Sequence, residues 1–267
     1  MRFKLVLSVQ TELAGNILPV SYQYELSSCV HRILTEDRGA YEQWLGMNGF
    51  LPEMNTRYKL LSVSNFYIPK IKVEEDRLYV LAKRVQLWIS TLPERGSEEF
   101  IRRAFQGRDI LVGDRKSQVA FKIDEIYKSE PVEYTETMTY LSLSPIVVSC
   151  MRANRSFEYI GPESPDYEEL LLHTILEKYR YFYGKDFPYE SNFKFELIAP
   201  PKRKGIFIKR FTREESKVIG YMCKFRLTLH PVLQQLIHNT GLGDKISLGF
   251  GCIEILSLIH ISEPTRH

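Results

Sequence analysis

Apolar and polar residues alternate over Arg2–Gln10, which is the pattern of a half-buried strand. After Pro19 the apolar residues recur at intervals of three and four, which predicts a helix over Tyr22–Leu34. A second, shorter helix is predicted over Ala40–Met47. The chain is therefore expected to open with one strand followed by two helices.

The rest of the first half returns to strand patterns, interrupted by one helix. This helix is predicted to begin near Ser97 and to be closed by Gly107. The predicted strands are Lys59–Phe66, Leu78–Leu81, Val85–Thr91, Asp109–Val112 and Val119–Tyr127.

The second half repeats this order of elements. A strand-rich segment at Thr137–Met151 precedes a long helix over Asp166–Tyr183 and a strand at Phe193–Ile198. The basic segment that follows resembles a hairpin. The remaining elements are predicted as a long alternating strand at Lys217–Leu229, a helix from Pro231 to Thr240, and a last strand at Cys252–Leu256.

Each half thus follows a β-α-β-β-α-β order, which is the ferredoxin-like order that RRM domains share. We expect an α+β protein with two tandem ferredoxin-like domains, residues 1–130 and 131–256, joined within Ser129–Thr137. The duplication is one of element order, because the two halves show no repeated sequence. The last segment, SLIHISEPTRH (257–267), resembles translated adapter or vector sequence, and we expect it to be foreign to the protein.

Composition supports a folded chain inside the cell. The 267 residues are 44% hydrophobic and 12% aromatic, which is enough for a substantial core. No window approaches the roughly 18 apolar residues that a membrane span needs, and the short apolar start lacks a cleavage site. The four cysteines are far apart and form no Cys-x-x-Cys pair, so neither a zinc site nor a disulfide framework is indicated. We expect a cytoplasmic protein.

Positive charge is concentrated in one place. The net charge is only +3, yet residues 200–217 (PPKRKGIFIKRFTREESK) contain seven Lys or Arg and two Glu. The rest of the chain is therefore slightly acidic. Concentrated positive charge on a nearly neutral protein suits a polyanionic ligand, although a solvated basic hairpin without a ligand has the same composition.

Two Gly-x-Gly pairs occur near the end of the chain, in GLGDKISLGFG (residues 241–251). A P-loop requires Gly-Lys-Ser/Thr between a strand and a helix, whereas these glycines follow a helix and precede a strand. A phosphate cradle is excluded on this ground. Glycine's backbone freedom remains, with Gly241 placed to end the helix and the others to allow close backbone approach.

This glycine-rich loop resembles the signature loop of CRISPR-associated proteins of the RAMP superfamily. Together with MRFKLVLSV, VSYQYELSSCVHRIL and YLSLSPIVVSC, it resembles the family of CRISPR repeat-processing endoribonucleases over residues 1–256. The loop residues concerned are Gly241, Gly243, Gly249 and Gly251.

The resemblance implies an endoribonuclease that binds CRISPR repeat RNA and cuts the precursor transcript once per repeat, yielding guide RNAs for antiviral defence. The 2′-hydroxyl attacks the adjacent phosphate and leaves a 2′,3′-cyclic phosphate, with no metal and no cofactor. This chemistry needs a base, an acid and a cation for the phosphorane charge. Subunits of a CRISPR effector complex and a second copy of the chain are further candidate partners.

His31 is the leading catalytic candidate. It is the only histidine in the first half, and it lies on the first predicted helix, where some members of the family have a catalytic tyrosine or histidine. An unperturbed imidazole titrates near neutral pH, which suits acid–base work. The resemblance adds Lys59 for the transition-state charge, although a solvated lysine at the start of a strand is the alternative interpretation. Tyr24, Tyr22 and Arg57 are weaker candidates for orienting the RNA.

The chain also departs from the family. Many relatives carry a histidine in the second short helix, where WLGMNG places Gly46. Either His31 acts alone, or the activity is weak, or the chain is a catalytically inactive RNA-binding subunit of the same fold. An unrelated RRM-like protein is a third alternative, but neither half carries the aromatic RNP consensus.

The resemblance places the basic hairpin against the repeat RNA. Phe207 and Phe211 alternate with its basic residues, and each can either stack on a base or pack in the core. The predicted RNA-binding residues are Lys202, Arg203, Lys204, Lys209, Arg210, Arg213, Lys245, Arg152 and Arg155.

Overall fold

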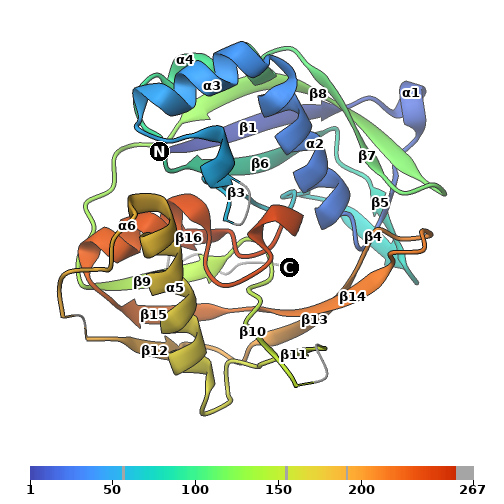
Figure 1. Cartoon of the computed structure of the whole chain (residues 1–267). Helices are drawn as coiled ribbons and strands as arrows, with labels where there is room; N and C mark the ends of the chain where they lie inside the picture. The colour runs from blue at the N-terminus through green and yellow to red at the C-terminus, as the bar shows by residue number, and fades with distance from the viewer. Residues whose placement is uncertain (56–57, 154–155, 191, 257–267) are drawn as a thin grey trace.

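Two antiparallel sheets with helices packed on them make up the fold (Figure 1). The computed structural model describes residues 1–55, 58–153, 156–190 and 192–256. The first sheet has the order β3-β6-β1-β8-β7 and the second the order β12-β15-β9-β16. The strands of the first sheet are β1 (Arg2–Val9), β3 (Leu61–Val63), β6 (Arg84–Thr91), β7 (Asp109–Gly113) and β8 (Gln118–Lys128). Those of the second are β9 (Thr137–Ser142), β12 (Lys194–Leu197), β15 (Lys224–Thr228) and β16 (Ile253–Ile255).

The helices occupy equivalent places in the two halves. The first half carries α2 (Gln23–Glu36), α3 (Arg38–Met47) and α4 (Ser97–Phe105). The second carries α5 (Tyr167–Tyr183) and α6 (Pro231–Thr240). Among the described residues, no helix has the length and apolarity to cross a membrane.

Both sheets have the ferredoxin-like strand order. In each, the first strand of the β-α-β-β-α-β unit lies between the third and the fourth, and the second lies beside the third. The first half adds β7 at its open edge. The predicted fold class is thus confirmed, and residues 129–136, which form neither helix nor strand, connect the two sheets.

The alternation at the start of the chain makes β1 the central strand of the first sheet. Phe3, Leu5 and Leu7 are fully buried, and β1 pairs with β6 on one side and β8 on the other. A strand with neighbours on both sides satisfies its backbone hydrogen bonds while its apolar side chains fill the core.

The predicted single strand over Lys217–Leu229 is wrong. The segment forms two strands in different sheets: β14 (Ser216–Met222) pairs with β13 (Lys202–Ile208), and β15 pairs with β9 and β12. At the break, the Cys223 amide donates to the Ser142 hydroxyl at 2.7 Å. The alternation continues through the break, so the sequence pattern hides the change of sheet.

Several short elements have no clear sequence signal. They are α1 (Thr11–Ala14), β2 (Ile17–Pro19), β4 (Ile71–Glu74) and β11 (Phe157–Tyr159). Strand β10 (Ser149–Met151), which pairs with β11, falls within the predicted strand-rich segment Thr137–Met151. Strands β2 and β4 flank β5 (Arg77–Val80), which corresponds to the predicted strand at Leu78–Leu81. Every residue of β4 is exposed, so burial imposes no pattern on its sequence.

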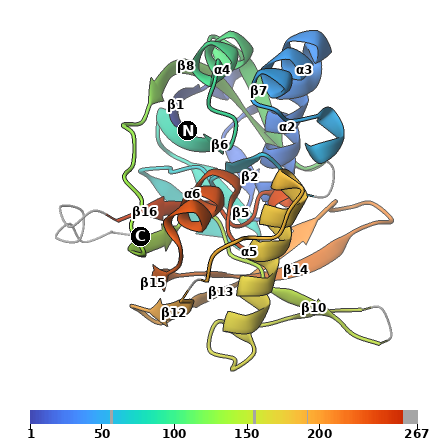
Figure 2. The ribbon, with the colours of Figure 1, turned by 60° about the vertical axis from the view of Figure 1, so that its left-hand side comes forward.

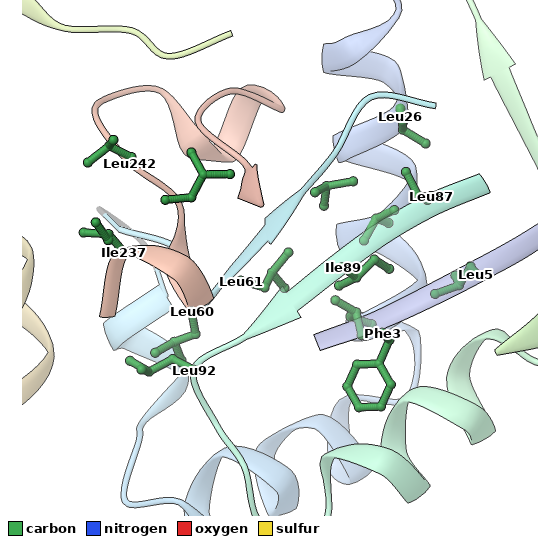
Figure 3. Packing of buried hydrophobic residues seen from close by; sticks show 14 of the residues in the cluster. Phe3, Leu5, Leu26, Leu60, Leu61, Leu87, Ile89, Leu92, Ile237 and Leu242 are labelled. Atoms are coloured by element: carbon green, nitrogen blue, oxygen red, sulfur yellow. The ribbon is translucent and has the colours of Figure 1, made fainter. Parts of the chain in front are cut away.

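One hydrophobic core runs through both halves. Figure 3 shows Leu60 and Leu92 of the first half near Ile237 and Leu242 of the second. Figure 2 shows the two halves stacked, with α6 next to the strands of the first. Because apolar burial continues across the junction, the halves form one packed body.

Buried polar contacts join the halves beside this core. The Arg2 guanidinium donates to the Ile253 carbonyl at 2.8 Å and the Ser90 hydroxyl at 3.0 Å, and it forms an ion pair with Glu254 at 3.1 Å. The amino group of Met1 donates to the Thr91 carbonyl at 2.7 Å, and burial lowers its pKa to about 6. Arg2 is only 5% exposed, so these partners are needed to offset its desolvation.

Replacing Arg2→Met is therefore expected to lower the free energy of unfolding by about 3 kcal/mol, because it leaves Glu254 and a buried carbonyl without their cation. Denaturant unfolding measures this loss. Lys4→Met, two residues along the same strand, removes a cation that lies 5.3 Å from the Tyr127 ring and should cost less than about 1 kcal/mol. Equal losses for the two variants would contradict the assignment of Arg2 as a tie between the halves.

Candidate active site and RNA-binding surface

Helix α2 presents His31 at the junction of the two halves. Its apolar residues, among them Leu26, Val30 and Leu34, are buried against the first sheet and leave a different face free for the second half. His31 follows Ser27 by four residues and Tyr24 by seven, so all three lie along that face. His31 is half-buried, whereas its neighbour Arg32 is exposed.

The environment of His31 keeps its imidazole neutral. Burial, and then the positive charge of Lys59, lower the pKa of His31 to about 4. Among the described residues, the His31 ring forms no hydrogen bond, so its lone pair is not committed to another side chain. A neutral imidazole at physiological pH is a proton acceptor, which is the form that a general base requires.

Lys59 is the second predicted catalytic residue, and the structure brings it within electrostatic reach of His31. Partial burial lowers the pKa of Lys59, and the nearby Tyr181 opposes this shift. Two residues at one site, one neutral and basic and the other cationic, match the needs of phosphoryl chemistry on RNA.

Tyr181 on α5 is a residue of this site that sequence reasoning missed. Its hydroxyl donates to the Glu53 carbonyl at 3.2 Å, and its ring lies edge-on to Tyr58 at 5.2 Å. Helix α5 belongs to the second half, so both halves contribute to the surroundings of Lys59. No motif marks Tyr181, because it is one of several aromatic residues in an amphipathic helix.

Tyr24 and Tyr22 lie away from the His31–Lys59 pair. Tyr24 is two helical turns before His31, about 10 Å along the axis, and lines a cavity of about 620 Å³ together with Glu25, Lys209 and Arg213. The buried Tyr22 hydroxyl accepts from the Phe66 amide at 2.9 Å, and burial raises its pKa. Tyr22 is therefore a structural residue, and Arg57 lies outside the described residues.

The glycine-rich loop is packed as tightly as its composition predicts. The φ angles of its four glycines lie between +74° and +89°. A Cβ on Gly243 would meet the Val147 carbonyl at 2.3 Å, and one on Gly249 would meet the Gln23 carbonyl at 2.5 Å. The expectation that side chains would not fit in this loop is confirmed.

The basic hairpin, β13–β14, extends toward β4 and β5 of the first half (Figure 1). Two of its predicted RNA-binding cations are already paired: Arg210 with Asp76 at 2.7 Å, and Lys209 with Glu214. The others are exposed and, within the described part of the chain, form no ion pair. They are Lys202, Arg203, Lys204 and Arg213.

The aromatic residues of the hairpin form cation–π contacts with cations of the same hairpin. The Arg210 guanidinium lies 5.5 Å from the Phe207 ring centre and 5.0 Å from that of Phe211. Phe207 also packs near the amine of Lys217, at 5.3 Å. Both rings are only partly exposed, and these contacts occupy faces that a base would need for stacking.

The remaining predicted RNA contacts differ in their surroundings. Arg152 is exposed but forms a two-pronged ion pair with Glu158, at 2.9 and 2.6 Å. The Lys245 amine sits 3.8 Å from the centre of the Phe157 ring. Arg155 lies outside the described residues. Across the part of the chain that the structure describes, no three His, Cys, Asp or Glu side chains gather closely enough to hold a metal ion.

Comparison with known proteins yields one consistent family. Residues 128–255 match the family model of CRISPR associated protein Cas6, C-terminal. The chain is 24% identical over 258 residues to the CRISPR-associated endoribonuclease Cas6 of Pyrococcus furiosus, an alignment covering 96% of this chain and 90% of that protein. A putative CRISPR-associated endoribonuclease-like protein Cas6 of the same organism is 24% identical over 251 residues, covering 90% and 93%.

Solved structures share the fold. The product of a Cas6-related gene from Pyrococcus furiosus superimposes with a TM-score of 0.79 at 20% identity, covering 97% of this chain and 99% of that one. A RAMP protein described as binding different RNA substrates gives a TM-score of 0.78 at 19% identity, covering 96% and 100%. At this identity the superpositions establish the two-domain fold.

The local environment of His31 can be tested by NMR titration of its ring protons. The wild-type pKa is expected near 4, and Lys59→Met should raise it toward 6.5, because a neighbouring cation disfavours the imidazolium form. Lys202→Met, which removes an exposed hairpin cation, is the matched control and should leave the pKa unchanged. A wild-type pKa near 6.5, or no response to Lys59→Met, would contradict the described electrostatics.

Proposed function

We propose that the chain is a CRISPR-associated protein of the Cas6 family, and that it binds CRISPR repeat RNA and cuts the precursor transcript within the repeats. The observation that carries this proposal is that His31, kept neutral chiefly by burial, lies within electrostatic reach of Lys59 at the junction of the two halves. A relative that aligns over 96% of this chain and 90% of its own length is named as an endoribonuclease.

The proposed reaction uses the RNA's own 2′-hydroxyl as nucleophile. His31 accepts the proton of this hydroxyl while its oxygen bonds to the adjacent phosphorus. The bond from phosphorus to the 5′-oxygen then breaks, and that oxygen takes a proton from the His31 imidazolium. Lys59 stabilises the negative charge of the phosphorane. The products are a 2′,3′-cyclic phosphate and a 5′-hydroxyl, and atoms and protons balance without a metal ion.

RNA binding in this proposal rests on the exposed cations of the hairpin. Lys202, Arg203 and Lys204 precede the apolar part of β13 and face solvent. Phosphates bind such cations with release of counterions. Arg210 and Lys209 already have carboxylate partners, so a phosphate gains less by replacing Asp76 or Glu214 than by meeting a free cation.

The absence of a histidine at Gly46 favours a second candidate, a repeat RNA-binding protein without cleavage. Gly46 is exposed near the end of α3, and a Cβ there would meet no atom within 4 Å. The space around position 46 would therefore accept a side chain such as histidine, although the residue there is glycine. A Gly46→His variant that cuts where the wild type only binds would support this second candidate.

Cleavage is tested by incubating the purified protein in EDTA with repeat RNA from its own genome. The wild type should make a single cut that leaves a cyclic phosphate. His31→Ala should slow cutting by about 100-fold or more, the usual effect of losing a general base, and leave RNA affinity within a few-fold. His173→Ala, an exposed histidine on α5, is the matched control and should cut normally. Tight binding without any cut would overturn the enzyme proposal.

The hairpin is tested by the salt dependence of RNA affinity. The triple change Lys202→Gln, Arg203→Gln and Lys204→Gln should weaken binding and reduce the slope of log K against log[salt] by about 2, near 0.7 for each lost phosphate contact. Arg152→Gln removes a cation that Glu158 already neutralises, so its effect on the slope should be small. An unchanged slope in the triple variant would place the RNA elsewhere.

A further inference from the structure

The four glycines of the loop are not equivalent. Three of them approach backbone of their own half: Cβ atoms built on Gly243 and Gly251 would meet the carbonyls of Val147 and Leu242 at 2.3 Å, and one on Gly241 would meet that of Gly251 at 3.1 Å. Gly249 alone of the four approaches the other half, where its Cβ would lie 2.5 Å from a carbonyl of α2. Its φ of +89° also belongs to the region that favours glycine.

A second contact joins the loop to the same face of α2. The Ser27 hydroxyl donates to the Ser247 carbonyl at 3.2 Å, and Ser27 is fully buried. Gln23, which Gly249 touches, lies four residues before Ser27, and His31 lies four residues after it. Residues at intervals of four form one stripe along a helix. The loop therefore contacts two successive turns of α2, at Gln23 and at Ser27. His31 lies on the same face, one turn further along the helix.

The other side of the loop is fixed to its own half. The amine of Lys178, on α5, is buried and donates to the Gly241 carbonyl at 2.6 Å. Asp244 accepts from the amide and hydroxyl of Ser149 at 2.9 and 2.8 Å. Tyr181, which faces Lys59, follows Lys178 by three residues on the same helix. Figure 1 shows the short helix of the loop, Ile246–Leu248, beside the first turns of α2.

We propose that Gly249 and Ser27 are positioning residues for His31. Because Gly249 has no side chain, the loop packs directly against the backbone of α2. The hydrogen bond from Ser27 to the loop fixes the position of the loop along the helix. Together they set how α2 presents His31 relative to Lys59. This role rests on the proposed cleavage, but the geometric part of it concerns His31 in the RNA-free protein and can be measured without cleavage.

The test compares Gly249→Ala with Gly243→Ala. Each adds one methyl group at a position of positive φ, close to a carbonyl, but only the first meets α2. Gly249→Ala should shift the pKa of His31 measured by NMR toward 6.5 by at least one unit. It should also lower kcat about tenfold or more, with KM for repeat RNA within threefold. Gly243→Ala should leave the pKa of His31 unchanged, whatever it does to stability.

Ser27→Ala serves as a second variant in case Gly249→Ala does not fold. It removes one hydrogen bond without adding volume, and it should shift the pKa of His31 and kcat in the same direction by a smaller amount. An unchanged pKa of His31 in folded Gly249→Ala, or in Ser27→Ala if the glycine variant fails to fold, would overturn the positioning role. Equal shifts in the two glycine variants would do so as well. If the wild type binds RNA without cutting it, the proposed function fails and the pKa comparison still decides the positioning role.

Discussion

Close contact between the two halves is the constraint on which this structure depends. The halves share one hydrophobic core, and at its edge the glycine-rich loop of the second half touches backbone of α2 in the first. Backbone can approach backbone this closely only where the intervening residue has no side chain. The candidate site lies at the same junction, since His31 comes from the first half and Tyr181, beside Lys59, from the second.

Burial at the junction also determines the chemistry available there. The same desolvation that penalises charge on His31 leaves a neutral imidazole next to a cationic amine. Away from the junction, in the basic hairpin, the cations keep their charge and either pair with carboxylates or remain exposed. Part of the basic hairpin is neutralised by its own carboxylates and by Asp76, while the first three cations of β13 remain exposed. The net basicity of residues 200–217 therefore overstates the charge available to a ligand.

Much of the fold could be predicted from the sequence, because the burial of one face of a strand or helix gives its apolar residues a regular spacing. The strand at Arg2–Gln10 and the helices near His31 are recovered on this basis. Burial imposes no period on the exposed β4, so its sequence does not predict a strand. At Cys223 the alternation continues across a change of sheet, so the sequence predicts one strand where there are two. His31 and Lys59 were predicted through a family resemblance. Tyr181 and the contact of Gly249 with α2 depend on packing between distant segments, which no local pattern records.

The proposed function places RNA cleavage at His31 and Lys59. Its most direct test is the structure of the protein bound to repeat RNA with a 2′-O-methyl group at the cleavage site, which blocks the nucleophile without removing its oxygen. If His31 and Lys59 act as proposed, a ring nitrogen of His31 lies within about 2.6–3.2 Å of that oxygen, and the amine of Lys59 lies next to the scissile phosphate. A scissile phosphate bound against another surface, away from the His31 ring, would contradict this assignment.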